Sequence, residues 1–595
     1  MMKNILFMSV LAAAGCASCE SGKTVRVSDY GFDEADSTRF LQAALDSGAT
    51  KVVIDSRRWI TLPLRVRSGQ EIVFEDGAVV EAKKGAYLDV NDSVFNLLSV
   101  SNVTLCGKGE IRMHHDDYLK PPYKKAEWRH CVNILGCDNV RVSGLKLLQG
   151  GGDGVYVGAL SQGRMRKWRV STWRPWSSNI VLEDLYIDTH VRQGMSITSC
   201  KGLTADRCVF RNTWGLPPQA GVDLEPNGPE NPIVGMVFRD CTFENNRGAG
   251  FEFALSHLEP GESEKYDCLF ERCRFVKDNI VVHNTRPDHT QIGGSIVLRD
   301  CAFIDPRSMP LAVGMMPDRP FSCVIENCRI VDNGIETKID DDWLVRNAPL
   351  LASGDRVPSV RTKVDFASLV VVDGEPGVAH KLHHFTFRNH VRFAVYADRG
   401  RMLTFRGGYA SFGRFKPKKA PVLQPLVVED ISGAKVAEIP MPVFDRKNPL
   451  AFSFDAPKKG FYFIRAEMNR KGFVLAEADA PVAVDLTSDW QDVIGSTGTL
   501  SFHVPPTASR FGVFASGDGG ECVAATVKDP TGKIVWENGC IAAWAGHVAE
   551  AGAASGLWTL TLAKPEKGDF EDERIDLVGV PGFFFLDPTR YWKAD

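Results

Sequence analysis

A short cysteine motif that recurs through the middle of the chain is the feature that most limits how it can fold. Each copy has two polar residues, a cysteine, a variable residue and a large hydrophobic residue, and successive copies lie 33, 32, 28 and 27 residues apart. The copies are residues 206–210, 239–243, 271–275, 299–303 and 326–330. Strand-forming repeats of variable period, separated by Asn, Asp or Gly turns, predict a solenoid of β-strands.

Strand geometry predicts where these cysteines point. Side chains alternate between the two faces of a strand, so Cys208 and Phe210 share a face. Stacked coils would bring the five cysteines into a column inside a parallel β-helix. A set of disulfides or a metal site is the alternative, but CxxC pairs are absent from the motif and the spacing is one cysteine per coil. We therefore expect a column of buried thiols in a right-handed parallel β-helix.

The regions around the repeats complete the predicted architecture. Asp36 and Ser37 precede an amphipathic segment that ends near Gly48, which predicts a short helix covering the open first coil. We expect the β-helix domain to span residues 24–340. Hydrophobic strands without the cysteine spacing follow, and they predict two β-sandwich modules at residues 381–480 and 485–595.

The first 19 residues read as an export signal and not as part of the fold. An apolar stretch after Lys3 is too short to span a bilayer, and small residues around Cys16 follow it. Ordinary signal cleavage and lipidation of Cys16 both fit this pattern. Either one predicts an exported protein, located in the periplasm, on the outer membrane or outside the cell, with a lipid on Cys16 as its membrane attachment.

Four glycine-led segments of neighbouring coils show where acidic side chains gather. They are residues 154–158, 194–198, 221–225 and 250–254. The second and fourth residues are hydrophobic and face the core, so the third residue is expected to face solvent. The third residues are Tyr156, Ser196, Asp223 and Glu252. Because coils stack roughly 4.8 Å apart, Asp223 and Glu252 should be direct neighbours.

Two more carboxylates are predicted on the same outer face of the solenoid as Asp223 and Glu252, and we call this face the wall. Glu225 projects from the strand of Asp223, two residues on, and Asp153 lies just before the first of these strands. Like charges this close raise at least one pKa, which supplies the acid and the base of a glycosidase. A charged stripe that only keeps the solenoid soluble and a calcium site are the alternatives. We interpret Asp223, Glu225, Glu252 and Asp153 as catalytic, with no metal and no cofactor.

An insertion at residues 164–176 favours a sugar ligand. It carries three Trp and five basic residues, and Trp faces stack on sugar rings while Arg and Lys bind hydroxyls or anions. A loop folded back onto the solenoid is the alternative. The candidate substrate-binding residues are Tyr156, Arg192, Gln193, Trp214, Asn227, Trp173, Trp176 and His283.

Three of these coils resemble a known family. Residues 151–156, 192–197 and 220–227 are similar to the central coils of glycoside hydrolase family 110, the α-1,3-galactosidases. The resemblance covers about residues 25–330. It implies an inverting exo-enzyme that releases terminal galactose without a metal cofactor, with Asp223, Glu225 and Glu252 at positions that could act as its carboxylates. The Trp-rich insertion departs from the family pattern and leaves the sugar open.

These observations predict an exported, exo-acting glycoside hydrolase whose partner is a glycan. The balance of 70 basic and 74 acidic residues argues against nucleic acid as a partner. A polysaccharide lyase that acts on an acidic glycan is one alternative, because the insertion is basic. A non-catalytic surface protein that only binds glycans is the other.

Overall fold

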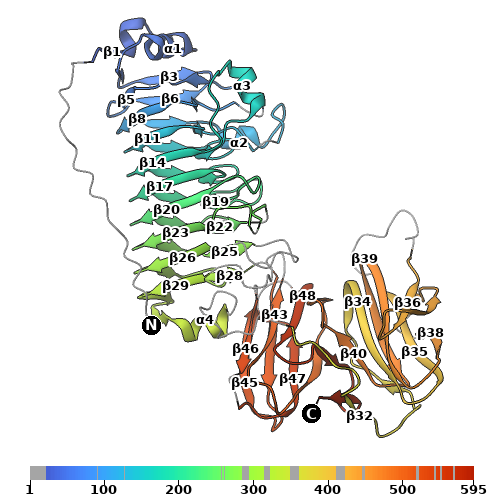
Figure 1. Cartoon of the computed structure of the whole chain (residues 1–595). Helices are drawn as coiled ribbons and strands as arrows, with labels where there is room; N and C mark the ends of the chain where they lie inside the picture. Colours follow the sequence, from blue (N-terminus) through green and yellow to red (C-terminus); the bar gives the residue numbers. More distant parts are fainter. Residues whose placement is uncertain are drawn as a thin grey trace. The chain divides into compact units, whose positions relative to one another are not determined.

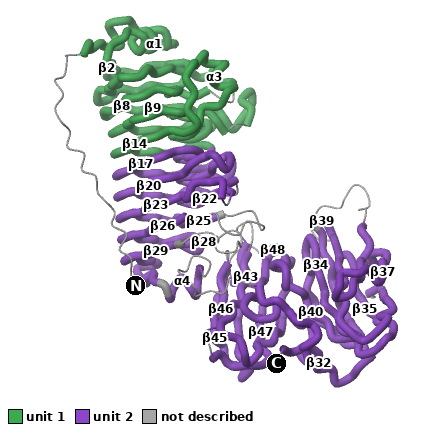
Figure 2. The backbone as a smooth tube through the Cα atoms, viewed as in Figure 1, with its two compact units in different colours: residues 1–191 green, residues 192–595 purple. Residues whose placement is uncertain are grey.

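A computed structural model describes most of the chain after the export signal. The described residues are 22–594 without 90–91, 126, 256, 260, 284–293, 314–321, 349–360, 411–422, 445–448, 518–520, 542–543, 550–551 and 567–569. Residues 1–21, with the predicted signal and Cys16, lie outside them. The chain divides into two compact units, residues 1–191 and 192–595 (Figure 2). No helix among the described residues is long and apolar enough to cross a membrane.

The first unit consists of coils whose strands pair in parallel, in three sheets A, B and C (Figure 1). Its sheet A contains β1 (Thr24–Arg26), β2 (Lys51–Ile54), β5 (Glu71–Phe74), β8 (Ser101–Gly107), β11 (Asp138–Ser143) and β14 (Ser177–Glu183). Its sheet B contains β3 (Arg58–Thr61), β6 (Val79–Ala82), β9 (Glu110–Arg112), β12 (Lys146–Leu148) and β15 (Tyr186–Asp188). Its sheet C contains β4 (Leu64–Arg65), β7 (Phe95–Leu98), β10 (Val132–Leu135) and β13 (Val155–Gly158).

The second unit repeats this arrangement in its first part. Its sheet A contains β17 (Cys200–Asp206), β20 (Ile233–Arg239), β23 (Tyr266–Glu271), β26 (Gly294–Arg299) and β29 (Ser322–Glu326). Its sheet B contains β18 (Val209–Arg211), β21 (Thr242–Glu244), β24 (Arg274–Val276), β27 (Ala302–Ile304), β30 (Cys328–Asp332) and β31 (Ile335–Ile339). Its sheet C contains β16 (Met195–Ile197), β19 (Val222–Leu224), β22 (Phe251–Ala254), β25 (Ile280–His283) and β28 (Leu311–Val313). The predicted parallel β-helix is confirmed.

The interior of these coils contains columns of similar residues, one from each copy of the motif. The five motif cysteines are buried with free thiols, as predicted, and each is at most 1% exposed. The last motif residue forms a second column, in which Phe243 stacks on Phe210 at 5.4 Å and on Phe275 at 4.7 Å between ring centroids. The disulfide that the structure describes joins Cys522 and Cys540, far from the motif. The repeat is therefore a packing repeat.

A turn conformation explains why a polar residue always precedes the cysteine. The residue before each motif cysteine has a left-handed backbone, with φ between +51° and +54°. These residues are Arg207, Asp240, Arg272, Asp300 and Asn327. Asn and Asp adopt this conformation more readily than most residues, and β-branched residues avoid it. The chain turns from sheet A into sheet B at this point, so the motif marks one corner of every coil.

Short helices and one antiparallel strand flank the coils. In the first unit, η1 (Val27–Tyr30) precedes α1 (Thr38–Asp46), which begins after Ser37 as predicted and packs on β3 and β4. The helices α2 (His115–Tyr118) and α3 (Gln162–Trp168) lie in turns of the same unit. In the second unit β31 pairs antiparallel with β30 and ends the parallel coils, and α4 (Asp341–Asn347) follows it.

The C-terminal region of the second unit is antiparallel. Its strands are β32 (Val370–Val372), β33 (His380–Lys381), β34 (Thr386–Ala397), β35 (Arg401–Ala410), β36 (Leu426–Asp430), β37 (Lys435–Ile439), β38 (Ala451–Ala456), β39 (Gly460–Ala478), β40 (Val482–Asp485), β41 (Gln491–Ile494), β42 (Gly498–Val504), β43 (Phe511–Gly517), β44 (Val523–Lys528), β45 (Ile534–Ile541), β46 (Ala545–Ala549), β47 (Gly556–Ala563), β48 (Asp572–Val578), β49 (Phe583–Phe585) and β50 (Tyr591–Lys593). Buried residues from Leu382 to Leu586 form one hydrophobic cluster. The division into two β-sandwich modules remains a proposal.

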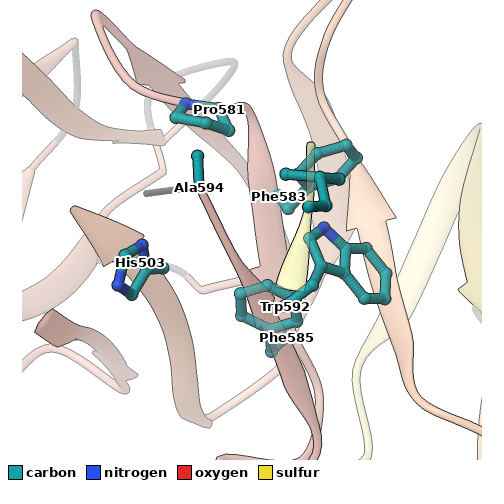
Figure 3. Close-up of a pocket in the computed structure, with 7 residues that line it drawn as sticks. His503, Pro581, Phe583, Phe585, Trp592 and Ala594 are labelled. Carbon is teal, nitrogen blue, oxygen red and sulfur yellow. The ribbon is translucent and has the colours of Figure 1, made fainter. Parts of the chain in front are cut away.

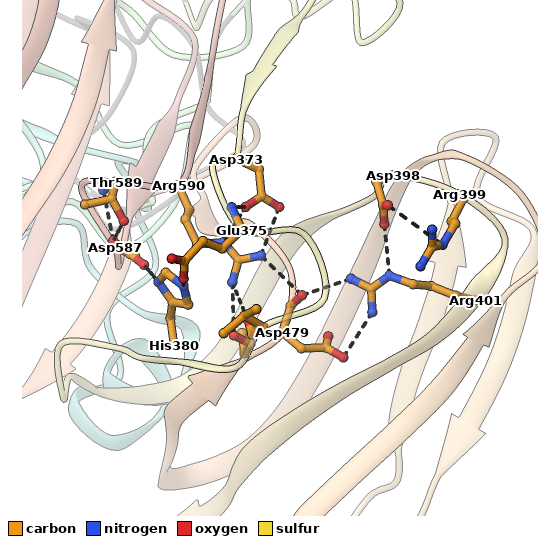
Figure 4. A network of polar contacts seen from close by, with 12 residues as sticks. Asp373, Glu375, His380, Asp398, Arg399, Arg401, Asp479, Asp587, Thr589 and Arg590 are labelled. Carbon is orange, nitrogen blue, oxygen red and sulfur yellow. Dashed lines mark hydrogen bonds and ion pairs between the residues drawn. The ribbon is translucent and has the colours of Figure 1, made fainter.

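Buried polar and aromatic contacts hold the end of the chain to this region. Arg590, 2% exposed, donates to both carboxylate oxygens of Asp373 at 3.0 and 2.9 Å (Figure 4). Two residues on, Trp592 is buried and lines a small pocket with Phe583 and His503 (Figure 3). The strand β50 is therefore anchored by both charge pairing and aromatic packing.

A buried glutamate gives this region a stability that depends on pH. Glu573 on β48 is 2% exposed, and burial raises its pKa to about 8 from the ordinary 4.5. A group whose pKa is raised on folding contributes stability at pH values below its pKa in the unfolded chain. That contribution is lost as the pH rises through its pKa in the folded chain. At pH 9.5 we expect Glu573→Gln to be more stable than the wild type by roughly 2–4 kcal/mol. Thermal unfolding at pH 5 and 9.5 checks this, and the exposed neighbour Glu571→Gln is the control. An equal effect at both pH values would contradict it.

Candidate active site

The second unit brings the predicted carboxylates together as the register required. In sheet C, Ser196 on β16 pairs with Asp223 on β19, and Asp223 pairs with Glu252 on β22. Val222 and Leu224, which flank Asp223, are fully buried and face the core. The prediction that Asp223 and Glu252 are direct neighbours is confirmed.

The exposure predicted for this wall is wrong for two of its residues. Ser196 is 0% exposed and Asp223 is 1% exposed, although both point away from the core. The buried side chain of Gln193 accounts for part of this cover: its Nε2 donates to Asp223 Oδ2 at 2.9 Å, and its Oε1 accepts from the Ala220 N–H at 2.7 Å. Asp223 is therefore held in one orientation by a turn residue and shielded from bulk water.

Arg192, the neighbour of Gln193, orients the next carboxylate. Its Nη2 donates to Glu225 Oε2 at 3.0 Å, and the Arg192 side chain is 10% exposed. The Glu225 N–H donates to the Ile197 carbonyl at 3.0 Å, which continues the pairing of β19 with β16 by one residue. The turn that precedes β16 thus contacts two carboxylates, Asp223 through Gln193 and Glu225 through Arg192.

Glu252 has the electrostatic environment of a carboxylic acid. Burial raises its pKa to about 7 from the ordinary 4.5, the negative charge of Glu225 adds to the rise, and the positive charge of Arg192 opposes it. Glu252 therefore keeps its proton to a higher pH than an ordinary glutamate does. The wall combines a protonated carboxyl at Glu252 with carboxylates that hydrogen-bond to Gln193 and Arg192.

Asp153 and Tyr156 lie in the first unit, beside a histidine that sequence reasoning missed. Asp153 and His130 are both fully buried, the Asp153 N–H donates to His130 Nδ1 at 3.1 Å, and the Asp153 carboxylate lies 3.4 Å from the same nitrogen. The His130 ring stacks on Tyr156 at 4.8 Å between centroids. His130 precedes Val132 by two residues, as Asp153 precedes Val155, and Val132 pairs with Val155. Extending the alignment back by one coil could have found His130.

The first half of the Trp-rich insertion is a packing element. It forms α3, and Met165, Trp168 and Val170 pack on a cluster of Leu98, Leu135 and Leu160. This is the alternative considered above. Leu98 and Leu135 are paired residues of β7 and β10, Leu160 follows β13, and these apolar side chains are buried by the insertion. The second half stays accessible.

The remaining candidates for substrate binding differ in exposure. Trp173 is 55% exposed, with its indole N–H donating to the Leu160 carbonyl at 2.9 Å, and Trp214 is 40% exposed. Trp176 is half-buried and Asn227 is exposed. The backbone of His283 pairs with Ala254 at the end of β25, but its side chain lies outside the described structure. Trp173 in the first unit and Trp214 in the second unit are thus the more exposed of these tryptophans.

Removing Arg192 should move the pKa of Glu252 upward. The Arg192 charge opposes the rise, so we expect Arg192→Met to raise that pKa above 7 by roughly one unit. Carbon-13 NMR titration of labelled glutamates, with Glu252→Gln to assign the signal, measures the change directly. Lys201→Met is the control, because Lys201 lies on β17 of sheet A and pairs with the exposed Glu264, which precedes β23. An unchanged titration of Glu252 in Arg192→Met would contradict the electrostatic coupling.

The fold and this wall define a parallel β-helix protein with clustered carboxylates on sheet C. No family model matches the chain. A curated relative, the uncharacterized protein YclG of Bacillus subtilis, is 26% identical over 145 residues. That match covers 23% of this chain and 23% of the relative, so less than a quarter of the relative's length is represented here.

Several solved structures resemble this chain at low identity. A family 28 exopolygalacturonase from Yersinia enterocolitica is 12% identical with a TM-score of 0.39, over 52% of this chain and 66% of that one. The polygalacturonase of Erwinia carotovora is 10% identical with a TM-score of 0.37, over 55% and 98%. The endo-xylogalacturonan hydrolase of Aspergillus tubingensis is 13% identical with a TM-score of 0.34, over 54% and 79%. At these values the likeness carries no argument about activity.

Proposed function

We propose that the chain is a glycoside hydrolase that cleaves a glycan with Asp223, Glu225 and Glu252. The observation that carries the proposal is the raised pKa of Glu252, about 7, at a residue that pairs directly with Asp223 on the neighbouring strand. A solubilising stripe needs exposed, ionised groups, whereas Asp223 is almost fully buried and Glu252 is half-buried. Pairs of carboxyl groups with separated pKa values are the feature that acid–base cleavage of a glycosidic bond requires.

The contacts suggest how the work is divided. Glu252, protonated near neutral pH, is the group that gives a proton to the leaving glycosidic oxygen. Asp223 and Glu225 are the candidates for the base that takes a proton from the attacking water. Gln193 and Arg192 hold these two carboxylates in fixed directions, which preserves the geometry through the reaction. In an inverting reaction the base carboxylate and the acid lie on opposite sides of the sugar.

The finer part of the proposal rests on the sequence. The similarity of residues 220–227 and of the flanking coils to family 110 supports an inverting exo-enzyme that releases terminal α-linked galactose. Residues 1–19 support the proposal that the protein is exported, either after ordinary signal cleavage or with a lipid attached to Cys16. Asp153 also stays a proposed catalytic carboxylate, and its backbone N–H donates to His130 Nδ1 in the first unit.

A substrate panel tests the proposal. The full chain is incubated with α-galactosides and with acidic glycans, and the released monosaccharides are measured, together with absorbance in the ultraviolet. Hydrolysis that Asp223→Asn, Glu225→Gln and Glu252→Gln each abolish supports the proposal. Full activity in all three variants would overturn the site. An unsaturated, ultraviolet-absorbing product would instead establish a lyase, and glycan affinity without any turnover would establish a binding protein.

A further inference from the structure

A positively charged pocket lies in the turns that lead into β22, which carries Glu252, and into β25 and β28, the next two strands of sheet C. It has a volume of about 210 Å³. It lies where three successive coils turn from sheet B into sheet C, after β21, β24 and β27. Its lining residues are Arg247, Gly248, Lys277, Asp278, Asn279, Arg307 and Ser308.

The floor of the pocket is a fixed polar network. Asp278 is 2% exposed and Asn246 is fully buried. The Asn246 side-chain amide donates to Asp278 Oδ2 at 2.7 Å, and Arg307 Nη2 donates to Asp278 Oδ1 at 3.1 Å. Arg307 Nε also donates to the Lys277 carbonyl at 2.7 Å. The guanidinium of Arg307 is therefore held in place at the pocket.

The walls of the pocket carry positive charge that the described residues do not neutralise. Arg247 and Lys277 are exposed, and neither side chain has an ion pair or hydrogen bond within the described part of the chain. Asp278 is the acidic residue of the lining, and it already binds Arg307 and Asn246. Burial raises the pKa of Asp278 to about 7, which weakens the negative charge that it contributes near neutral pH. The lining therefore has a surplus of cations.

Contacts of the pocket turn place it beside the proposed active site. The Arg247 N–H donates to the carbonyl of Thr213 at 2.9 Å, next to the exposed Trp214. The side-chain amide of Asn246 lies against Gly221, two residues before Asp223. Arg247 itself precedes Glu252 by five residues in the same coil. A glycan that reaches from Trp214 along these turns would pass the pocket.

We propose that this pocket binds an anionic group of the glycan, so that the substrate is an acidic saccharide. The pocket is smaller than those that enclose drug-sized ligands, and its size suits one charged substituent of a sugar ring. The carboxylate of a uronic acid and a sulfate ester share this chemistry, and both accept paired hydrogen bonds from a guanidinium. The assignment of the pocket to the substrate rests on the proposed function, whereas the binding of the anion does not.

A binding experiment separates the pocket from catalysis. Full-length Glu252→Gln protein is titrated by calorimetry with inorganic sulfate, D-galacturonate and neutral D-galactose. We expect at least one of the two anions to bind tenfold or more tightly than galactose. The double variant Arg247→Ala/Lys277→Ala should lose that preference, while Arg274→Ala/Lys338→Ala, which removes two exposed cations of sheet B, should keep it. The tighter of the two anions identifies the substituent.

Three results would overturn the inference: neither anion preferred over galactose, a preference that survives in Arg247→Ala/Lys277→Ala, or a preference that is lost equally in the control. Turnover then separates the two proposals. Anion binding that depends on Arg247 and Lys277, with no sugar released from any glycan, would refute the hydrolase and keep the pocket. Hydrolysis of neutral and acidic glycans at wild-type rates by Arg247→Ala/Lys277→Ala would refute the pocket as a substrate site and keep the hydrolase.

Discussion

Glu252→Gln is expected to lower turnover by about 10²–10⁴-fold on the substrate that the wild type cleaves best. The amide keeps the shape of the side chain but cannot give a proton to the leaving oxygen. In the wild type the rate should fall as pH rises above about 7, because Glu252 then loses its proton. Initial rates between pH 5 and 9 measure both effects, with Glu244→Gln on sheet B of the same coil as the control. A wild-type rate in Glu252→Gln would contradict the assignment of the acid.

The same variant should be more stable than the wild type at alkaline pH. The pKa of Glu252 in the folded chain is about 7 and its ordinary value is 4.5. Its contribution to stability is therefore complete below about pH 4.5 and is lost as pH rises through 7, up to about 3 kcal/mol. Glu252→Gln removes this dependence, so its Tm should exceed that of the wild type at pH 8.5 and not at pH 5. Lower stability at both pH values would mean that the loss of turnover is a folding defect.

Phe243→Ala is expected to destabilise the solenoid by roughly 3–5 kcal/mol. Phe243 is fully buried, lies between Phe210 and Phe275 in the aromatic column, and meets Phe251 edge-on at 5.8 Å. Its removal leaves a cavity between coils that cannot collapse, because the parallel strands on either side fix the spacing of the coils.

Urea unfolding measures the loss of global stability, and hydrogen exchange of the backbone amides shows which coils open more often. The coil of Glu252 should be affected first, because Phe251 precedes that residue. Ile335→Ala is the control: this side chain is 71% exposed, so its removal should change stability by less than about 0.5 kcal/mol. A loss below 1 kcal/mol in Phe243→Ala would show that the column is not the core of the solenoid.

The alternation of side chains was enough to predict the coils and the register of the wall. A residue two positions after a turn glycine can only point away from the core, so Asp223 and Glu252 had to meet. The burial of Asp223 was not predictable in this way. It depends on the Gln193 side chain, which reaches Asp223 from the turn of another coil, and strand periodicity contains no information about such contacts.

The other features that the sequence did not predict also lie in turns. The composition of the insertion favours sugar binding, yet its Trp168 packs on Leu98, Leu135 and Leu160. Asn246, Asp278 and Arg307 come from three coils and differ in residue type, so no repeat marks them. Such a site forms through contacts between different residue types that are far apart in the sequence. The repeat pattern predicts only the features that the coils have in common.

The column of buried thiols places one motif cysteine in each of the five coils of the second unit. Cys208, Cys241, Cys273, Cys301 and Cys328 sit at one equivalent position, so their reaction with an alkylating reagent depends on how often each coil opens. Peptide mass spectrometry after a short alkylation pulse would rank the coils by local stability. The five motif cysteines would therefore report the order in which these coils open.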